Sequence, residues 1–198
     1  MEDKVSLDSG GAEKQAPVKK PKRINRIIFL ASSLIILNAL LTHSFESRST
    51  KTLKIGDSLP AYTLTMTNGK KMSSADLAGK PTMYFFYADW CPCSHKSAWP
   101  IKQAHKEYKS QGLEVVAIGL QDTSDRLAKF AKTHELDFPV CADGGQVVAS
   151  EMGVTITPTT VFVDKDGVIQ SVFVGRVDRF DQLTDGLNSI LPSHADKV

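Results

Sequence analysis

One junction in the middle of the chain constrains its fold more than any other stretch. Thr82 to Tyr87 is almost entirely apolar and aromatic, which is typical of a strand covered on both faces of a sheet. It is followed closely by Cys91-Pro92-Cys93 and then by helix-forming residues. Proline suits the first turn of a helix, and the free N–H groups and dipole of a helix start favour a thiolate. The junction therefore predicts a central strand that presents Cys91 as a reactive thiol.

Charge divides the chain into two unequal parts. Residues 1–50 contain 8 Lys/Arg and 5 Asp/Glu, whereas residues 51–198 contain 16 and 17. The larger part is close to neutral, so the basic pI of about 8.4 comes from the N-terminal part. This distribution argues against a nucleic-acid-binding face on the globular part.

The N-terminal part has the pattern of a membrane anchor. We expect residues 1–26 to be a disordered, basic, cytoplasmic tail, because they contain few large apolar groups. Residues 27–45 are apolar enough to predict a transmembrane helix, and positive charge before them places the following domain outside the cytoplasm. Residues 46–54 have the composition of a short polar tether. A cleaved signal peptide and a buried core helix are the alternatives for the apolar run.

Residues 55–192 predict one α/β domain, followed by a short tail at 193–198. Hairpin signals at Asn68-Gly69 and Asp164–Gly167 flank an alternation of buried strands and amphipathic helices, which predicts a mixed sheet between helix layers. The helices expected in this domain and their caps are a short turn from Ser74 to Leu77 capped by Ser74, residues 94–110 with Pro100 inside, a helix capped by Asp122 or Ser124 that ends near His134, residues 145–152, and Phe180 to Leu191.

Several short motifs along this domain resemble one known family. They are Ile55-Gly-Asp57, Gly79-Lys80-Pro81, Phe85-Phe-Tyr-Ala-Asp-Trp-Cys91, Gly153-Val154, Thr157-Pro158-Thr159-Thr160 and Asp164-Lys-Asp-Gly167. Together they resemble membrane-anchored thioredoxin-like proteins of the TlpA/ResA type. The resemblance implies a thioredoxin-like fold with an N-terminal β-hairpin extension. It also implies a single-pass protein of the bacterial inner membrane, whose domain faces the periplasm or cell exterior.

The same resemblance implies thiol–disulfide exchange with protein substrates and a redox partner in the membrane or periplasm, with no cofactor, metal or nucleic acid. Cys91 is the expected attacking thiol and Cys93 the expected resolving thiol. The substrate-binding positions that it implies are Trp90, Pro92, Thr157 and the cis proline Pro158.

Two features of the chain depart from the family pattern. The family separates its cysteines by two residues, whereas Pro92 alone separates Cys91 from Cys93, and Ser94 takes the expected second position. A Cys91–Cys93 disulfide would require non-helical geometry at one residue. Phe85 stands where thioredoxins bury an acidic residue.

Two further side chains are candidates for auxiliary roles. His95, one turn after Cys91, could lower the pKa of the thiol when protonated, or could be a solvated helix-face residue. Cys141 lies in an apolar stretch, where a buried core cysteine is the simpler interpretation.

Two other functions remain open at this stage. Cys91, Cys93 and His95 form C-x-C-x-H, a soft ligand set suited to Cu(I). Sco-type copper chaperones use two cysteines and a distant histidine, for which His134 is a candidate. Peroxiredoxins share the fold but carry Thr or Ser three residues before the reactive cysteine and an arginine before the late strand. Ala88 and Pro158 occupy those places here.

Overall fold

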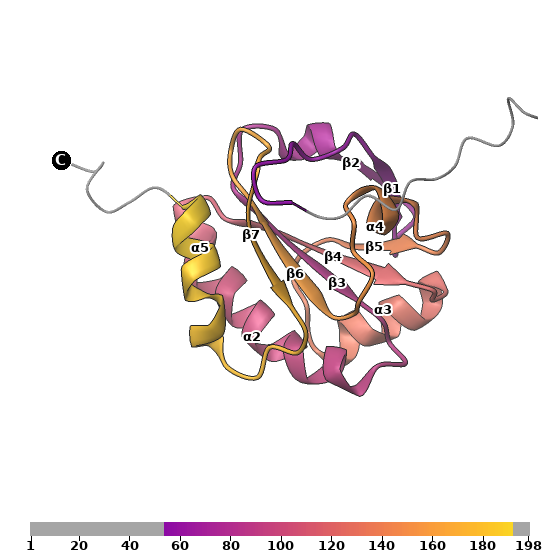
Figure 1. The fold of residues 1–198 in the computed structure, drawn as a ribbon. Helices are drawn as coiled ribbons and strands as arrows, with labels where there is room; N and C mark the ends of the chain where they lie inside the picture. The colour runs from indigo at the N-terminus through magenta and orange to yellow at the C-terminus, as the bar shows by residue number, and fades with distance from the viewer. Residues whose placement is uncertain (1–53, 192–198) are drawn as a thin grey trace, which may run out of the picture. The chain divides into compact units, whose positions relative to one another are not determined.

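The structure, a computed structural model, describes residues 54–191 (Figure 1). Among these residues no helix is long and apolar enough to cross a membrane. The predicted membrane anchor lies outside the described residues, so it stays a prediction. The predicted segments that lie outside the described residues are the tail 1–26, the anchor 27–45, the tether 46–54 apart from Lys54, and the tail 193–198.

A seven-stranded mixed sheet runs through the described domain, with the strand order β2-β1-β5-β4-β3-β6-β7. Strands β3, β4 and β5 are parallel, whereas the pairs β1–β2, β1–β5, β3–β6 and β6–β7 are antiparallel. The mixed sheet is as predicted. The strands are β1 (Thr63–Met66), β2 (Lys71–Ser73), β3 (Thr82–Tyr87), β4 (Glu114–Leu120), β5 (Val140–Asp143), β6 (Thr159–Val163) and β7 (Ile169–Val174).

Strand β3 is buried along its whole length, which confirms its predicted place inside the sheet. Its side chains alternate between the two faces, as strand geometry requires. Phe85 and Tyr87 belong to one core cluster, and Tyr84 and Phe86 belong to the other. The apolar run is continuous because the strand has a core on each side.

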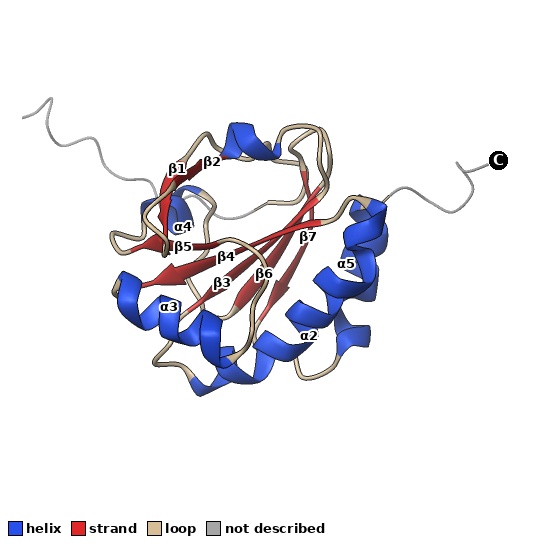
Figure 2. Cartoon of the chain, turned by 180° about the vertical axis from the view of Figure 1, so that it is seen from behind, coloured by secondary structure: helices blue, strands red, loops and turns tan. Residues whose placement is uncertain are grey.

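Each face of the sheet has its own cover. Helices α2, α3 and α5 pack on one face (Figure 2), and the β1–β2 hairpin, the turn η1 and helix α4 supply core residues to the other. This arrangement is a thioredoxin-like fold with the predicted hairpin extension. The helices and 3-10 turns are η1 (Ser74–Leu77), α2 (Pro92–Tyr108), η2 (Lys109–Gln111), α3 (Ser124–Thr133), α4 (Val147–Glu151), η3 (Phe180–Leu183) and α5 (Thr184–Ile190).

Two predicted helix caps are wrong by one residue. Ser73, not Ser74, caps η1, with its backbone N–H and its hydroxyl bonded to the Asp76 carboxylate at 2.7 and 2.8 Å. Ser74 instead accepts the N–H of Tyr62, on the chain leading into β1, at 3.3 Å. Thr123 caps α3, because its hydroxyl accepts the N–H of Arg126 at 3.5 Å.

Two helices also differ from their predicted bounds. Helix α2 begins at Pro92, the residue predicted for its first turn, continues through Pro100 as predicted, and ends at Tyr108, two residues before the predicted end. The last helical segment is a 3-10 turn followed by α5 rather than one helix. Two glycines allow helices to approach the sheet closely: a Cβ at Gly119 would collide with Leu127 of α3, and one at Gly186 of α5 would collide with the ring of Phe162.

Candidate active site

Cys91 lies between β3 and α2, at the residue that caps the helix N-terminus. Its backbone is still extended, with φ −94° and ψ 114°, and Pro92 takes the first helical position as predicted. The N–H groups of a first helical turn have no partner within the helix, and the positive end of the helix dipole lies there. The Cys91 sulfur therefore stands where the fold supplies unused hydrogen-bond donors.

Two opposing effects act on the Cys91 thiol. Partial burial acts to raise its pKa, but hydrogen bonds from the backbone N–H groups and the side chains of Ser94 and Cys93 outweigh that effect. The pKa of Cys91 therefore lies below the ordinary thiol value. Ser94 is fully buried, and its hydroxyl also accepts the N–H of Ala88 at 3.2 Å. One serine hydroxyl thus ties the end of the strand to the thiol.

Cys93 lies in the first turn of α2, half-buried, and all three cysteines are free thiols. A cation stands near it. The pKa of Arg176, just after β7, is raised chiefly by its hydrogen bond with Asp178 and further by its interaction with Cys93. The structure therefore brings the two predicted cysteines together, with a guanidinium on the side of the second one.

The predicted substrate-binding residues collect at the same end of the sheet. The Thr157–Pro158 peptide bond is cis, the conformation that the resemblance implies. The register pairs Thr159 with Phe86, near the end of β3, so Pro158 lies at the end of the sheet from which Cys91 emerges. Trp90 is 53% exposed, and Pro92 is also exposed. The roles of these residues in substrate binding stay predictions.

Sequence reasoning missed a set of ionic contacts that holds the residue before Trp90. The N–H of Asp89 donates to the carboxylate of Asp122 at 2.7 Å. The guanidinium of Arg126 donates to the Asp89 carboxylate at 3.0 and 2.9 Å, and its Nε lies 3.4 Å from Asp122. Asp122 lies two residues after the end of β4, and β4 is parallel to β3. The carboxyl ends of parallel neighbours lie at one edge of a sheet, which is the signal that could have found this contact.

His95 does not direct its ring nitrogens at the thiol. Nε2 lies 2.7 Å from the carbonyl oxygen of Asp89, and Nδ1 lies 2.8 Å from Nε2 of His134. The donors that lower the pKa of Cys91 come from Cys93 and Ser94 instead. The structure thus joins His95 to His134, which the sequence left without a role beyond a possible copper ligand.

Cys141 occupies the opposite kind of environment. It lies on β5, fully buried, in the core cluster on the α4 face. Burial raises the pKa of its thiol to about 11. This placement agrees with the interpretation of Cys141 as a core residue.

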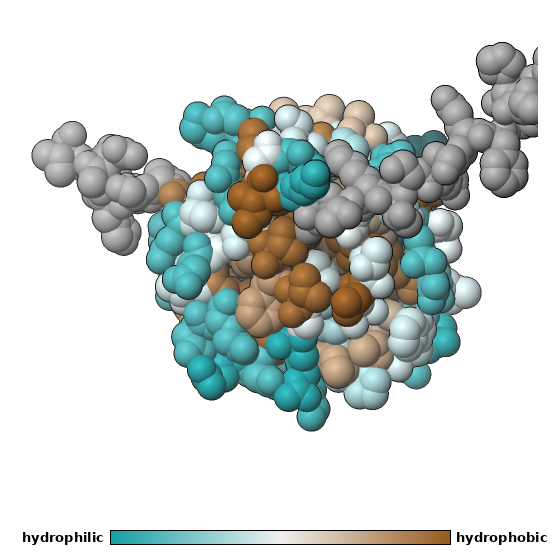
Figure 3. All heavy atoms as spheres, viewed as in Figure 1, coloured by the Kyte–Doolittle hydropathy of each residue, from teal (hydrophilic) through white to brown (hydrophobic). Residues whose placement is uncertain are grey.

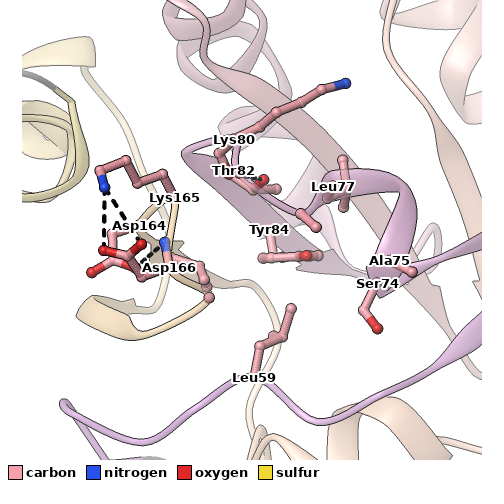
Figure 4. Close-up of a pocket in the computed structure, with 14 residues that line it drawn as sticks. Leu59, Ser74, Ala75, Leu77, Lys80, Thr82, Tyr84, Asp164, Lys165 and Asp166 are labelled. Atoms are coloured by element: carbon pink, nitrogen blue, oxygen red, sulfur yellow. Dashed lines mark hydrogen bonds and ion pairs between the residues drawn. The ribbon is translucent and has the colours of Figure 1, made fainter.

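The far end of the sheet carries a pocket of another character. A cavity of about 240 Å³ lies between η1 and the β6–β7 turn, with Thr82, Tyr84 and Lys165 in its lining (Figure 4). Thr82 begins β3 and so lies at the end away from Cys91. No cysteine or histidine lines this pocket. Within residues 54–191 no group of three or more His, Cys, Asp or Glu side chains is placed to hold a metal ion.

An apolar groove borders the Thr157–Pro158 segment. Hydrophobic side chains gather over β6 and β7 on the face seen in Figure 3. The groove has a volume of about 640 Å³, and both residues that precede Thr157 line it. Its lining consists of Lys54, Ile55, Gly153, Val154, Thr155, Ile156, Thr159, Val172 and Val174.

Comparisons with known proteins agree with this geometry. Residues 55–172 match the AhpC/TSA family model. The thiol-disulfide oxidoreductase ResA of Bacillus thuringiensis is 31% identical over 173 residues, which cover 85% of this chain and 98% of that protein. ResA of Oceanobacillus iheyensis is 33% identical over 183 residues, covering 88% of this chain and 94% of that protein.

Solved structures give the same result for the fold. A Chlorobium tepidum protein that bears the name thiol:disulfide interchange protein DsbE matches with a TM-score of 0.64 and 27% identity, over 69% of this chain and 97% of that one. Bacillus subtilis StoA matches with a TM-score of 0.55 and 20% identity, over 65% and 96%. From its family match and its relatives, the chain belongs to the AhpC/TSA family and is a homologue of the ResA thiol-disulfide oxidoreductases.

Proposed function

We propose that this protein exchanges disulfides with extracytoplasmic protein substrates through Cys91 and Cys93. In the reducing direction, the Cys91 thiolate attacks a substrate disulfide, the substrate S–S bond breaks, and one substrate thiolate leaves. The Cys93 thiolate then attacks the Cys91 sulfur of the mixed disulfide. A Cys91–Cys93 disulfide forms, and the second substrate thiolate leaves with the electron pair. The oxidising direction is the reverse of these steps.

The position of Cys91 at the N-terminus of α2 is the observation that carries the proposal. A thiol attacks as its thiolate, so a lowered pKa increases the attacking fraction near neutral pH. The donors from the first turn of the helix supply that stabilisation without any cofactor. The homology to ResA gives independent support for this chemistry.

Cys93 fits the resolving role because it lies two residues after Cys91, in the first turn of α2, where it contributes to the lowered pKa of the Cys91 thiol. Closing a ring across a single intervening residue strains the disulfide, which makes it a more ready oxidant.

The groove beside Thr157–Pro158 is the proposed seat of the substrate polypeptide. Ile156 is 56% exposed and Val174 is 58% exposed, so apolar side chains of a partner would gain contact area there. The residues just before the cis proline line the groove. The proline itself lies at the end of the sheet where Cys91 emerges, so the groove leads toward the thiol. We expect Trp90, Pro92, Thr157 and Pro158 to contact the residues of the substrate nearest its disulfide.

The proposal also includes a location for this chemistry. The apolar segment 27–45, with its preceding positive charge, supports a single-pass anchor in the bacterial inner membrane. The domain would then face the periplasm or cell exterior, where protein disulfides form and persist. A redox partner in the membrane or periplasm would restore the Cys91–Cys93 pair to its starting state.

The other two functions have less support. For copper binding, a histidine would have to join both sulfurs, but the Nε2 of His134 is bonded to His95. For peroxide reduction, Ala88 and Pro158 stand in place of the polar residues that the resemblance to peroxiredoxins requires. The Cys91 site therefore fits copper binding and peroxide reduction less well than thiol–disulfide exchange.

Trapping a covalent intermediate tests the proposal. The Cys93→Ala variant of the full chain is incubated with a disulfide-containing model protein, and adducts are identified by mass spectrometry. We expect a mixed disulfide through Cys91 that reducing agent releases, and no adduct for Cys91→Ser. Normal multiple turnover by Cys93→Ala would show that Cys93 does not resolve the intermediate. Stoichiometric Cu(I) binding lost equally in both variants would favour the copper carrier.

A further inference from the structure

Four side chains form hydrogen bonds with the loop that leads into Cys91. One of them is His95, and histidine is the residue type that titrates near neutral pH. Ser94 holds the N–H of Ala88, Asp122 holds the N–H of Asp89, and Arg126 holds the Asp89 carboxylate. The remaining contact joins the carbonyl oxygen of Asp89 to Nε2 of His95 at 2.7 Å. A carbonyl can only accept, so Nε2 of His95 carries a proton.

His134 fixes the other end of the His95 ring. The 2.8 Å contact between Nδ1 of His95 and Nε2 of His134 needs one proton between the two nitrogens. If both rings are neutral, His134 donates to His95. If the pair holds one extra proton, one ring is an imidazolium, and the contact persists with either nitrogen as the donor. If both rings are protonated, two N–H groups point at each other and the contact has to open.

The surroundings of the pair favour no more than one positive charge. The Asp89 carboxylate lies 3.8 Å from Nε2 of His95 and is shared with Arg126. Both imidazole rings pack on Phe130, with ring centroids at 4.8 and 4.5 Å. Burial lowers the pKa of His134, and the charges of His95 and Lys102 lower it further, whereas Asp89 acts in the opposite direction.

We propose that His134 is a positioning residue for the thiol–disulfide exchange, which holds His95 against the Asp89 carbonyl and releases that contact when both histidines become protonated. The inference rests on the proposed function of Cys91. It links helices α2 and α3 to the active-site loop through a contact between residues 39 positions apart.

The contact acts on the thiol through the loop. The N–H of Cys91 donates to the carbonyl oxygen of Ala88 at 3.1 Å, so the turn that His95 steadies also sets where Cys91 stands relative to its donors. When the pair opens, the His95 ring loses the contact that fixes its other nitrogen, so its hydrogen bond to the Asp89 carbonyl is less firmly positioned and the turn loosens. The Cys91 thiolate then loses part of the stabilisation that the first turn of α2 provides.

The direction of the pH effect follows from the lowered pKa of His134. A histidine with a lowered folded-state pKa binds fewer protons in the folded than in the unfolded protein. Its contribution to stability is therefore present above the ordinary value of 6.5 and is lost as the pH falls through the folded-state pKa. The active-site turn should be firm at neutral pH and should loosen in acid.

The test measures the alkylation rate of Cys91 by iodoacetamide from pH 4.5 to 9 in the full chain, with each cysteine resolved by mass spectrometry. In the wild type, we expect the rate below about pH 6.5 to fall more steeply than one ionisation allows. His134→Gln keeps a hydrogen bond to His95 without titrating. It should keep the rate at pH 7 and follow a single ionisation in acid.

His134→Ala should lower the rate at pH 7 about threefold, equivalent to about half a pKa unit of the thiol. His105→Gln is the matched control, because His105 lies on α2, as His95 does, and its ring also pairs with a neighbouring side chain, Asp137, at 2.9 Å. It should leave the pH profile of Cys91 unchanged. Proton NMR of the histidine rings gives a second readout, in which His134→Gln should change the ring resonances of His95 at pH 7.

A wild-type profile that follows one ionisation throughout, or a steep acid limb that persists in His134→Gln, would overturn the inference. If His134→Ala fails to fold, His134→Gln alone decides between these outcomes. A wild-type Cys91 that reacts no faster than a free unfolded thiol would instead overturn the proposed function, so the two failures are distinguishable.

Discussion

Cys91 and Cys141 carry the same thiol in opposite environments. Cys91 caps a helix, is partly exposed and receives hydrogen bonds that lower its pKa. Cys141 lies in the middle of the sheet, where burial raises its pKa to about 11. The difference teaches that the reactivity of a thiol in this chain is set by where the fold places it: at a helix start it becomes a nucleophile, and inside a strand it becomes a small apolar side chain.

The largest expected effect comes from removing each of the two thiols in turn. Cys91→Ser should reduce disulfide exchange with a model protein substrate by a factor on the order of a thousand or more, because Cys91 alone caps the N-terminus of α2 and has a lowered pKa. Cys141→Val, of similar size, should keep the wild-type rate within about twofold. Steady-state turnover of both purified variants checks the comparison. Loss of activity in Cys141→Val without unfolding would show that the buried thiol takes part.

A smaller effect is expected from replacing Ser94, whose hydrogen bonds lower the pKa of Cys91. Burial alone sets the pKa of Cys141. Ser94→Ala removes a donor to the sulfur and the acceptor for the N–H of Ala88. One lost hydrogen bond to a charged group corresponds to about one pKa unit, so alkylation of Cys91 at pH 6 should slow about tenfold. Ser189→Ala, on α5, is the control for losing a serine hydroxyl. An unchanged pH profile in Ser94→Ala would remove the serine from the account.

The sequence predicts the local parts of this comparison well. The apolar run before Cys91, the proline after it and the apolar neighbours of Cys141 are all adjacent in the chain. The strands, the hairpins and the position of Cys91, the proposed attacking thiol, follow from these local patterns. The thioredoxin-like fold follows from their order.

The parts that the sequence misses depend on contacts between distant residues. Asp89 meets Asp122 and Arg126 only because β3 and β4 lie side by side in parallel. Because Asp122 binds the loop before Cys91, it is not free to cap α3, and the next residue, Thr123, takes that role. The pair of His95 and His134 likewise requires α2 and α3 to pack together on one face of the sheet. No local pattern reports such pairings.

Access for the substrate gives a third difference between the two thiols. Ile156→Ser in the apolar groove should raise the KM for a protein substrate about fivefold, since about 1 kcal/mol of apolar contact would be lost. The rate with a small aromatic disulfide should not change. Val147→Ser, another exposed apolar residue outside the groove lining, is the matched control. Equal effects on large and small substrates would argue against a docking role for the groove.

The smallest expected effect concerns stability in alkali. A thiol whose folded-state pKa is raised stabilises the fold below the unfolded-state pKa, near 9.0, and that contribution is lost as the pH rises through about 11. Urea unfolding between pH 8 and 11 should therefore show a decline that is reduced in Cys141→Val. The decline should not vanish, because burial also raises the pKa of Tyr62 to about 12. An identical decline in the variant would mean that Cys141 ionises no less readily when folded.

Pulse alkylation of the folded wild-type chain tests the central claim most directly. A short exposure to iodoacetamide at pH 7, followed by peptide mass spectrometry, reports the modification rate of each cysteine separately. The account predicts that Cys91 reacts first, with a half-maximal rate at a pH below the ordinary thiol pKa, and that Cys141 reacts only after unfolding. Faster labelling of Cys93 than of Cys91, or equal labelling of all three cysteines, would contradict the claim that the helix start creates the nucleophile.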